Sequence, residues 1–240
     1  MRDLLLVFIF VLQCMGQTPE PQPSPLPAGG SLSGTLDGED GTAIADAIVG
    51  LTIVPPYPAG RLRQTEWTTT SGVNGSFQFV KLPPGNYRVC AQAQGTAWLN
   101  GCEWGAQPPP LSITATGPGV KYPVVLKKGV FVPVRLNDPS GLLAQYEGKS
   151  ASAQLLIGVE NDASFFRTAP IVSTDSAGRN HQVLIPFGAP INLVICSPVF
   201  QLSNAAGIAL PTSSTSILIF VQRGDQAQTL TLNITGVTLP

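Results

Sequence analysis

Apolar and polar residues alternate with a period of two along most of the chain beyond residue 29. In "AIVGLTIV", for example, Val49, Leu51 and Ile53 occupy every second position, and Phe77 and Phe79 do so in "GSFQFV". Side chains two residues apart lie on the same face of a β-strand, so each such segment predicts a half-buried strand. Beyond residue 16, no stretch keeps a helical apolar spacing over three turns without an intervening Gly or Pro. The pattern therefore predicts an all-β protein.

The predicted strands fall into two groups, and each group has the strand number and length of one antiparallel β-sandwich domain. The first domain is expected over residues 30–128 and the second over residues 129–240, and firm packing is expected because almost no linker separates them. The expected strands of the first are SLSGTLDG, AIVGLTIV, RQTEWTTT, GSFQFV, LPPGNYRVCAQA, PPLSITAT and KYPVVLKKG, and those of the second are GVFVPVRLND, SAQLLIGVE, SFFRTAPIVS, NHQVLIPFG, PINLVICS, SILIFVQ and QTLTLNIT.

The segment before these strands has features of targeting and of a spacer. Residues 1–16 predict a signal peptide, since Arg2 precedes an apolar run that is shorter than the roughly 20 residues needed to span a bilayer. The alternative is a lipid anchor at Cys14. Residues 17–29 contain "TPEPQPSPLP", which is typical of an extended polyproline II spacer. We therefore expect an exported protein whose mature chain has no membrane span.

The low content of charge separates this chain from disordered and nucleic-acid-binding proteins. Charged residues make up 11% and hydrophobic residues 43%, whereas disordered chains are rich in charge and poor in apolar residues. The net charge of -1 gives no basic field that would attract phosphates. We expect no nucleic-acid partner.

Three short motifs in the first predicted domain resemble the carboxypeptidase regulatory-like domain. The family's A-x-V-x-L is matched over residues 47–51, its G-x-F-x-F over residues 75–79 and its L-P-P-G-x-Y over residues 82–87. Glycine permits the tight turn before the second motif, and the prolines of the third set φ for another turn. The resemblance implies a transthyretin-like, carbohydrate-binding-like β-sandwich of the kind found in exported bacterial proteins. Gly72 stands where the family usually has Asp, so nothing supports a metal role for that turn.

The residues that catalytic and metal sites require are scarce. The metallopeptidases that give the family its name use two histidines and a glutamate for zinc, but His181 is the single histidine here and is expected to be structural or exposed. The chain contains neither a G-x-S-x-G elbow nor C-x-x-C spacing. Four acidic residues cluster near the first turn, where calcium binding is the alternative to an acidic hairpin turn. They are Asp37, Glu39, Asp40 and Asp46. We expect no catalytic residue, no metal site, no cofactor and no enzyme activity.

The cysteines fit an oxidising compartment. Cys90 and Cys102 would close a short loop, and an exported chain allows them to form a disulfide. Cys196 lies in the apolar segment "INLVICS" and is expected to be a buried thiol.

Four aromatic residues of the first domain are candidates for carbohydrate binding, because exposed rings stack on the apolar faces of sugars. They are Trp67, Trp98, Trp104 and Tyr57. The alternative is that these rings fill the core or cover the disulfide.

The sequence as a whole predicts an exported, non-enzymatic protein with a structural, adhesive or interaction role at the cell surface or in the periplasm. Its partner would be an extracellular polysaccharide or another envelope protein, and the alternative function is that of a carbohydrate-binding module. The "RGD" run at residues 223–225 resembles the integrin-binding tripeptide but is expected to be a turn.

Overall fold

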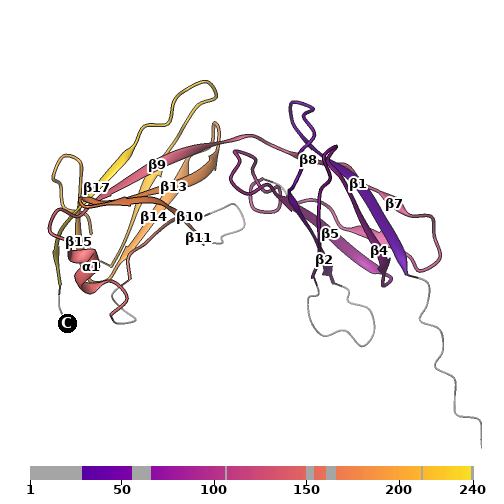
Figure 1. The fold of residues 1–240 in the computed structure, drawn as a ribbon, viewed down its shortest axis with the longest axis horizontal. Helices are drawn as coiled ribbons and strands as arrows, with labels where there is room; N and C mark the ends of the chain where they lie inside the picture. The colour runs from indigo at the N-terminus through magenta and orange to yellow at the C-terminus, as the bar shows by residue number, and fades with distance from the viewer. Residues whose placement is uncertain are drawn as a thin grey trace, which may run out of the picture.

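The structure is a computed structural model that describes residues 29–55, 66–105, 107–149, 154–160, 166–211 and 213–238. Within these residues the regular structure is β-strand apart from one short helix, which confirms the predicted all-β fold. The segments predicted as signal peptide and spacer lie outside the described residues. Figure 1 shows two lobes joined by strand β9, which we call unit one (β1–β8) and unit two (β9–β17).

Unit one consists of two sheets that face each other across an apolar core. One sheet has the order β4-β1-β7, with β8 also paired to β1, and the other has the order β3-β2-β5-β6. The core contains the side chains that the alternation predicts to point inward, among them Leu32, Leu51, Phe77 and Phe79. The strands are β1 (Gly30–Gly38), β2 (Ile48–Val54), β3 (Glu66–Thr70), β4 (Ser76–Leu82), β5 (Gly85–Gln92), β6 (Leu111–Ile113), β7 (Val120–Lys121) and β8 (Val124–Leu126).

The motif-bearing run from Gly75 to Tyr87 forms β4 and the start of β5, which belong to opposite sheets of unit one and are joined by a tight turn. Gly75 has a φ of 73°, and a side chain there would collide with the backbone of Leu36, so both conformation and space require glycine. The fully buried Tyr87 donates a 2.6 Å hydrogen bond from its hydroxyl to the Pro83 carbonyl. The turn between the two strands is thereby tied to the core.

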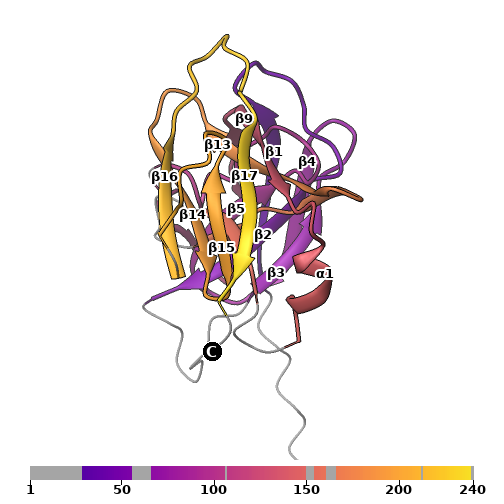
Figure 2. The same cartoon turned by 90° about the vertical axis from the view of Figure 1, so that its left-hand side faces the viewer.

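Unit two has a five-stranded sheet, β12-β13-β9-β17-β15, that faces the four-stranded sheet β11-β10-β14-β16. Val132, Leu193, Phe200 and Leu232 are among its core residues. Figure 2 shows this unit facing the viewer, with α1 near its lower end. Its elements are β9 (Gly129–Asn137), α1 (Leu142–Tyr146), β10 (Leu156–Glu160), β11 (Phe166–Thr168), β12 (Ile171–Asp175), β13 (Gly178–Pro186), β14 (Ile191–Ser197), β15 (Phe200–Asn204), β16 (Ser213–Ile219) and β17 (Leu230–Val237).

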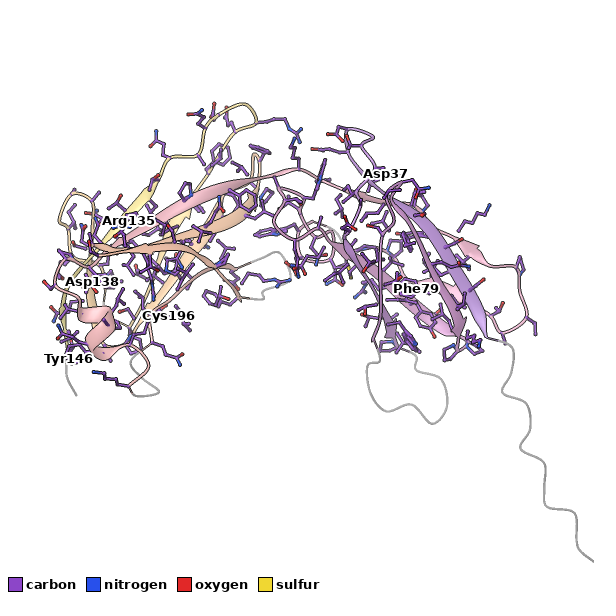
Figure 3. The ribbon with its side chains drawn as sticks, viewed as in Figure 1. Asp37, Phe79, Arg135, Asp138, Tyr146 and Cys196 are labelled. Atoms are coloured by element: carbon purple, nitrogen blue, oxygen red, sulfur yellow. A yellow bond between two sulfur atoms is a disulfide. The ribbon has the colours of Figure 1, made fainter. Side chains whose placement is uncertain are left out.

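Helix α1 was not predicted. The Asp138 carboxylate accepts hydrogen bonds from the N–H groups of Leu142 and Leu143, both at 2.8 Å, and so satisfies two donors at the start of the helix. The helix is only one turn and a half long, which is too short to show an apolar period. Figure 3 shows Asp138 and Tyr146 at the same end of unit two.

Two segments that were expected to be single strands are each divided at a proline. "SFFRTAPIVS" forms β11 and β12, which belong to opposite sheets, with Pro170 between them. "KYPVVLKKG" contributes to β7 and β8, which both pair with β1 and are separated by Pro123. Proline has no N–H for the ladder, so the pairing stops and the chain changes direction.

The two units share one pattern of strand pairing. In unit one, the first strand β1 pairs antiparallel with β4 and parallel with the last strands, β7 and β8. In unit two, the first strand β9 pairs antiparallel with β13 and parallel with the last strand, β17. The second sheets also correspond, with β10, β11, β14 and β16 in the places of β2, β3, β5 and β6. Short matches follow the same correspondence, "VGL" with "IGV" in β2 and β10 and "LPPG" with "IPFG" at the turns that lead from β4 to β5 and from β13 to β14. The chain is therefore built from one topology used twice, with β12 and β15 added to the second copy.

Candidate functional site

A loop of unit one, residues 93–105, lies between the two units, and we call it the junction loop (Figure 1). A disulfide joins Cys90 of β5 to Cys102 of the loop, with their Cα atoms 5.6 Å apart. The Asn100 side chain accepts the Cys102 N–H at 2.9 Å and donates to the Glu103 carboxylate at 3.0 Å. These bonds fix the shape of the loop beside β5.

The junction loop also holds the chain that connects the units. The Leu99 N–H donates to the Lys127 carbonyl at 2.8 Å, and the Gly129 N–H donates to the Ala97 carbonyl at 2.7 Å. Leu99 is only 3% exposed, and a side chain at Gly129 would collide with Leu99 and with the Ile185 backbone. The chain that links the two units is therefore closely packed between the junction loop and β13 of unit two.

Two neighbouring side chains of the junction loop reach unit two. Trp104 is half-buried and packs against the core of unit two rather than the core of its own unit. Glu103 forms an ion pair with Arg167 of β11. The loop thus makes an apolar contact and a charged contact with the second unit.

Arg223 makes a second ion pair across the junction. Its guanidinium donates a 2.6 Å hydrogen bond to Glu39 and lies 5.5 Å from the centre of the Phe187 ring. The Arg223 hydrogen bond, helped by the Lys128 N–H, holds the pKa of Glu39 below its ordinary value. A 3.1 Å hydrogen bond from the Asp225 N–H closes a turn here, so the "RGD" run forms a turn as expected.

The structure places the candidate aromatic residues in different settings. Trp67 packs against the core of unit one and meets Tyr87 edge to face, with 5.5 Å between ring centres. Tyr57 lies outside the described residues. Trp67 therefore shares no platform with the tryptophans of the junction loop.

Trp98 and Trp104 line one hollow of about 390 Å³ between the units. The Trp98 ring packs so closely on Gly38 that any side chain there would collide with it, and the Lys128 ammonium lies 5.7 Å from the ring centre. Both tryptophans are half-buried, so each has a packing role and a surface that faces the hollow. Polar side chains complete the lining, among them Gln92, Gln94, Thr96 and Gln182.

A second hollow of about 610 Å³ lies on the outer face of the sheet β3-β2-β5-β6. Four residues line both hollows, which places the hollows on either side of the junction loop. They are Gln92, Asn100, Glu103 and Arg167.

Two of the four acidic residues near the first turn, Glu39 and Asp40, are engaged in hydrogen bonds. Asp40 accepts the Thr42 N–H at 3.0 Å, which lowers its pKa, and Glu39 is paired with Arg223. Across the described ranges, no group of three or more His, Cys, Asp and Glu side chains is placed to hold a metal ion. The same ranges contain no helix with the length and apolarity to cross a membrane.

The expectation of a buried Cys196 is wrong. Ile195 faces the core, so the next residue along β14 points to the outer face, where the Cys196 side chain is half-buried. Its sulfur lies 3.8 Å from the Ser214 hydroxyl. An apolar segment identifies the strand, but the face of each residue depends on the register.

The residues that join the units were missed in the sequence. Glu103 and Arg167, and likewise Glu39 and Arg223, lie far apart along the chain, so no local pattern pairs them. The available signal was the set of large apolar residues Trp98, Leu99 and Trp104 in a loop that is otherwise short of them.

No family model and no curated protein matches the chain. Among solved structures, it is similar to a streptococcal ancillary pilin, at 12% identity and a TM-score of 0.40 over 90% of this chain and 67% of that one. It is similar to GBS52, the minor pilin of Streptococcus agalactiae, at 12% identity and a TM-score of 0.38 over 88% of this chain and 98% of that one. The match to the Bacillus anthracis TIE protein has 10% identity and a TM-score of 0.33, covering 86% of this chain but 34% of that one. At such scores these likenesses support no functional argument, and the resemblance to the carboxypeptidase regulatory-like domain stays a prediction.

Proposed function

We propose that the protein is an exported, non-enzymatic chain of two β-sandwich domains that acts as a structural or adhesive element at the cell surface or in the periplasm. The domains are residues 30–128, a carboxypeptidase regulatory-like module, and residues 129–240. Residues 1–16 direct export and residues 17–29 form a spacer. The partner is an extracellular polysaccharide or another envelope protein.

The observation that carries this proposal is the disulfide-held junction. Disulfides persist in oxidising compartments. The Cys90–Cys102 disulfide holds the junction loop, whose backbone hydrogen bonds fix the chain that links the units. Leu99, Trp104 and the Glu103–Arg167 pair then fix the angle between the units. A chain of two units at a fixed angle keeps a set distance between its ends, and this is the property that a structural or adhesive element requires.

Export is tested by expressing the full chain in a bacterial host beside a chain without residues 1–16. We expect the full chain outside the cytoplasm, accessible to protease added to intact cells or opened periplasm, with Cys90 and Cys102 oxidised. The shortened chain should stay in the cytoplasm with reduced thiols. Recovery of both chains in the cytoplasm would contradict the proposal.

The fixed angle is tested by small-angle X-ray scattering on Trp104→Ala. Loss of this ring removes the apolar contact with unit two, so the distribution of interatomic distances should broaden and extend to longer values. Val73→Ala is the control, because Val73 is 91% exposed and lies between β3 and β4, outside the junction loop. Identical curves for the two variants would show that Trp104 does not hold the units together.

A second candidate function, carbohydrate binding, is favoured by the hollow that Trp98 and Trp104 share with amide side chains. A glycan array probed with the oxidised chain tests it. Trp98→Ala should lose the signal, while Trp67→Phe, which lies outside the hollow, should keep it. Equal signals from both variants would exclude stacking on Trp98.

A further inference from the structure

We infer that the outer face of the sheet β3-β2-β5-β6 carries a binding trough for a saccharide that bears a carboxylate, such as a segment of a uronic-acid polymer. The trough is the 610 Å³ hollow, whose lining includes neither Trp98 nor Trp104. Its volume lies within the range of about 300–1,000 Å³ that is usual for small-ligand sites. The inference rests on the adhesive role proposed above and names the ligand class for it.

Gly50 forms the floor of the trough. It stands in the middle of β2, between Thr68 of β3 and Cys90 of β5. A Cβ added to Gly50 would find only the Cys90 carbonyl oxygen nearby, at 3.9 Å, and Gly50 has no positive φ. Neither packing nor backbone conformation therefore requires glycine here, although glycine weakens a strand. A bare backbone in the middle of a strand is a place where a ligand can approach closely.

Apolar side chains border the trough. Ile48 of β2 is 41% exposed and Phe166 of β11 is 40% exposed, and both line the hollow. A large apolar side chain left half in water at the rim of a polar hollow can cover the C–H face of a sugar ring. Phe166 comes from unit two, so the trough is complete only when the two units are joined.

Hydroxyl and amide groups supply the polar lining. Thr68, Gln92, Asn100 and Gln107 face the same hollow. Such groups both donate and accept hydrogen bonds, as the hydroxyl groups of a saccharide do.

Arg88 determines the charge of the preferred ligand. Its Nε donates a 3.3 Å hydrogen bond to the Pro108 carbonyl, which orients the guanidinium at the trough. Of the lining residues that the structure describes, Glu103 and Arg167 are also charged, and they neutralise each other as an ion pair. None of the ion pairs between described side chains involves Arg88. A guanidinium in a polar trough that has no acidic partner among the described side chains fits a carboxylate, which it can bind through two parallel hydrogen bonds.

The test is calorimetric titration of the oxidised full-length chain with oligogalacturonate, with neutral dextran oligosaccharide and with dextran sulfate of similar length. We expect the tightest binding to oligogalacturonate, weakened by added salt because part of the attraction is ionic. Arg88→Gln should weaken this binding by about tenfold or more. Lys121→Gln is the matched control, because it removes the same charge from β7 in the opposite sheet of unit one and should leave the affinity unchanged.

Gly50→Val tests the floor without changing any charge. It should weaken binding of oligogalacturonate while keeping the melting temperature at or above that of the wild type, since valine favours a strand. A variant with unchanged affinity would show that no ligand lies on Gly50.

Failure of this inference can be distinguished from failure of the proposed function. Absence of oligogalacturonate binding, equal binding of neutral dextran, tighter binding of dextran sulfate, or an unaltered affinity of Arg88→Gln would each overturn the carboxylate trough. None of these results changes where the protein is located, which the fractionation experiment decides. A chain confined to the cytoplasm that still bound through Arg88 would refute export and support the trough.

Discussion

At the scale of single residues, His181 places a titratable group in the core of unit two. The side chain is 4% exposed, its Nδ1 lies 3.0 Å from the Ala169 carbonyl oxygen, and its Nε2 has no partner within the described residues. Burial lowers the pKa of His181 below its ordinary value, and the nearby charge of Arg179 acts in the same direction. In unit one, the corresponding position of β4 holds Phe77. Unit two has thus a polar side chain where unit one has an apolar one.

We predict that the free energy of unfolding falls as the pH drops below about 6.5, the ordinary pKa of histidine. The unfolded chain takes up a proton there, whereas the folded chain keeps His181 neutral because its pKa is lowered. His181→Phe should remove this dependence between about pH 7.5 and 5.5, a range in which carboxylates stay ionised. Urea unfolding followed by tryptophan fluorescence measures it, and an unchanged slope in the variant would show that another group is responsible.

The limits of sequence-based prediction are visible in the same residues. Alternation correctly identified Val49, Leu51 and Phe77 as inward-facing, because burial of one strand face is a local property. It did not show that His181 would join them or that Cys196 would point outward, since both depend on how β13 and β14 register with their neighbours.

At the scale of the element, helix α1 depends on a single cap. Asp138→Ala removes the acceptor of two helix N–H groups and should lower the free energy of unfolding by roughly 1–3 kcal/mol. Ser140→Ala, an exposed substitution in the same loop, should leave it nearly unchanged. Urea denaturation compares the three proteins. Equal stabilities would mean that the helix contributes nothing to the fold.

The junction loop depends on its disulfide in a similar way. A Cys90→Ala, Cys102→Ala double variant should lose about 2–4 kcal/mol of stability and should exchange the amide hydrogens of residues 93–105 faster. Cys196→Ala should change neither property, because Cys196 is unpaired. Mass spectrometry of the intact chain gives an independent check, since reduction must add two hydrogen atoms. Absence of that mass change would refute the disulfide.

Elements were predictable where the pattern was long and regular. The two strands β4 and β5 and the turn between them follow from Gly75, the paired phenylalanines and the Pro-Pro-Gly turn, but their placement in opposite sheets does not. The divisions at Pro123 and Pro170 were missed. A proline ends a strand there because the segments before and after it pair in different ladders or sheets, and the sequence does not show which ladder or sheet each segment joins. Helix α1 was missed because its cap lies three residues before its N-cap position, at Asp138.

At the scale of the whole molecule, the sequence predicts two sandwiches but not their relation. The shared pairing pattern emerges only when β1, β4 and β8 are compared with β9, β13 and β17, because the matching segments are short. The candidate site could not be foreseen either, since its lining combines Gly50, Arg88 and Phe166 from three distant segments. Strand pairing brings Gly50 and Arg88 together and packing between the units adds Phe166, and neither leaves a local pattern in the chain.

The parallel pairing of first and last strands has a mechanical consequence. Within each unit the chain enters at one end of β1 or β9 and leaves at the opposite end, along β8 or β17. A tensile load on the two ends of the chain would therefore shear these ladders, straining all their hydrogen bonds together. Single-molecule pulling from residues 29 and 238 should require a higher force than pulling residues 171 and 181 apart across the antiparallel β12–β13 hairpin, whose bonds break one after another. Equal unfolding forces in the two pulling directions would refute this prediction. A higher force for pulling along the chain would mean that each unit is suited to carry tension between its two attachment points.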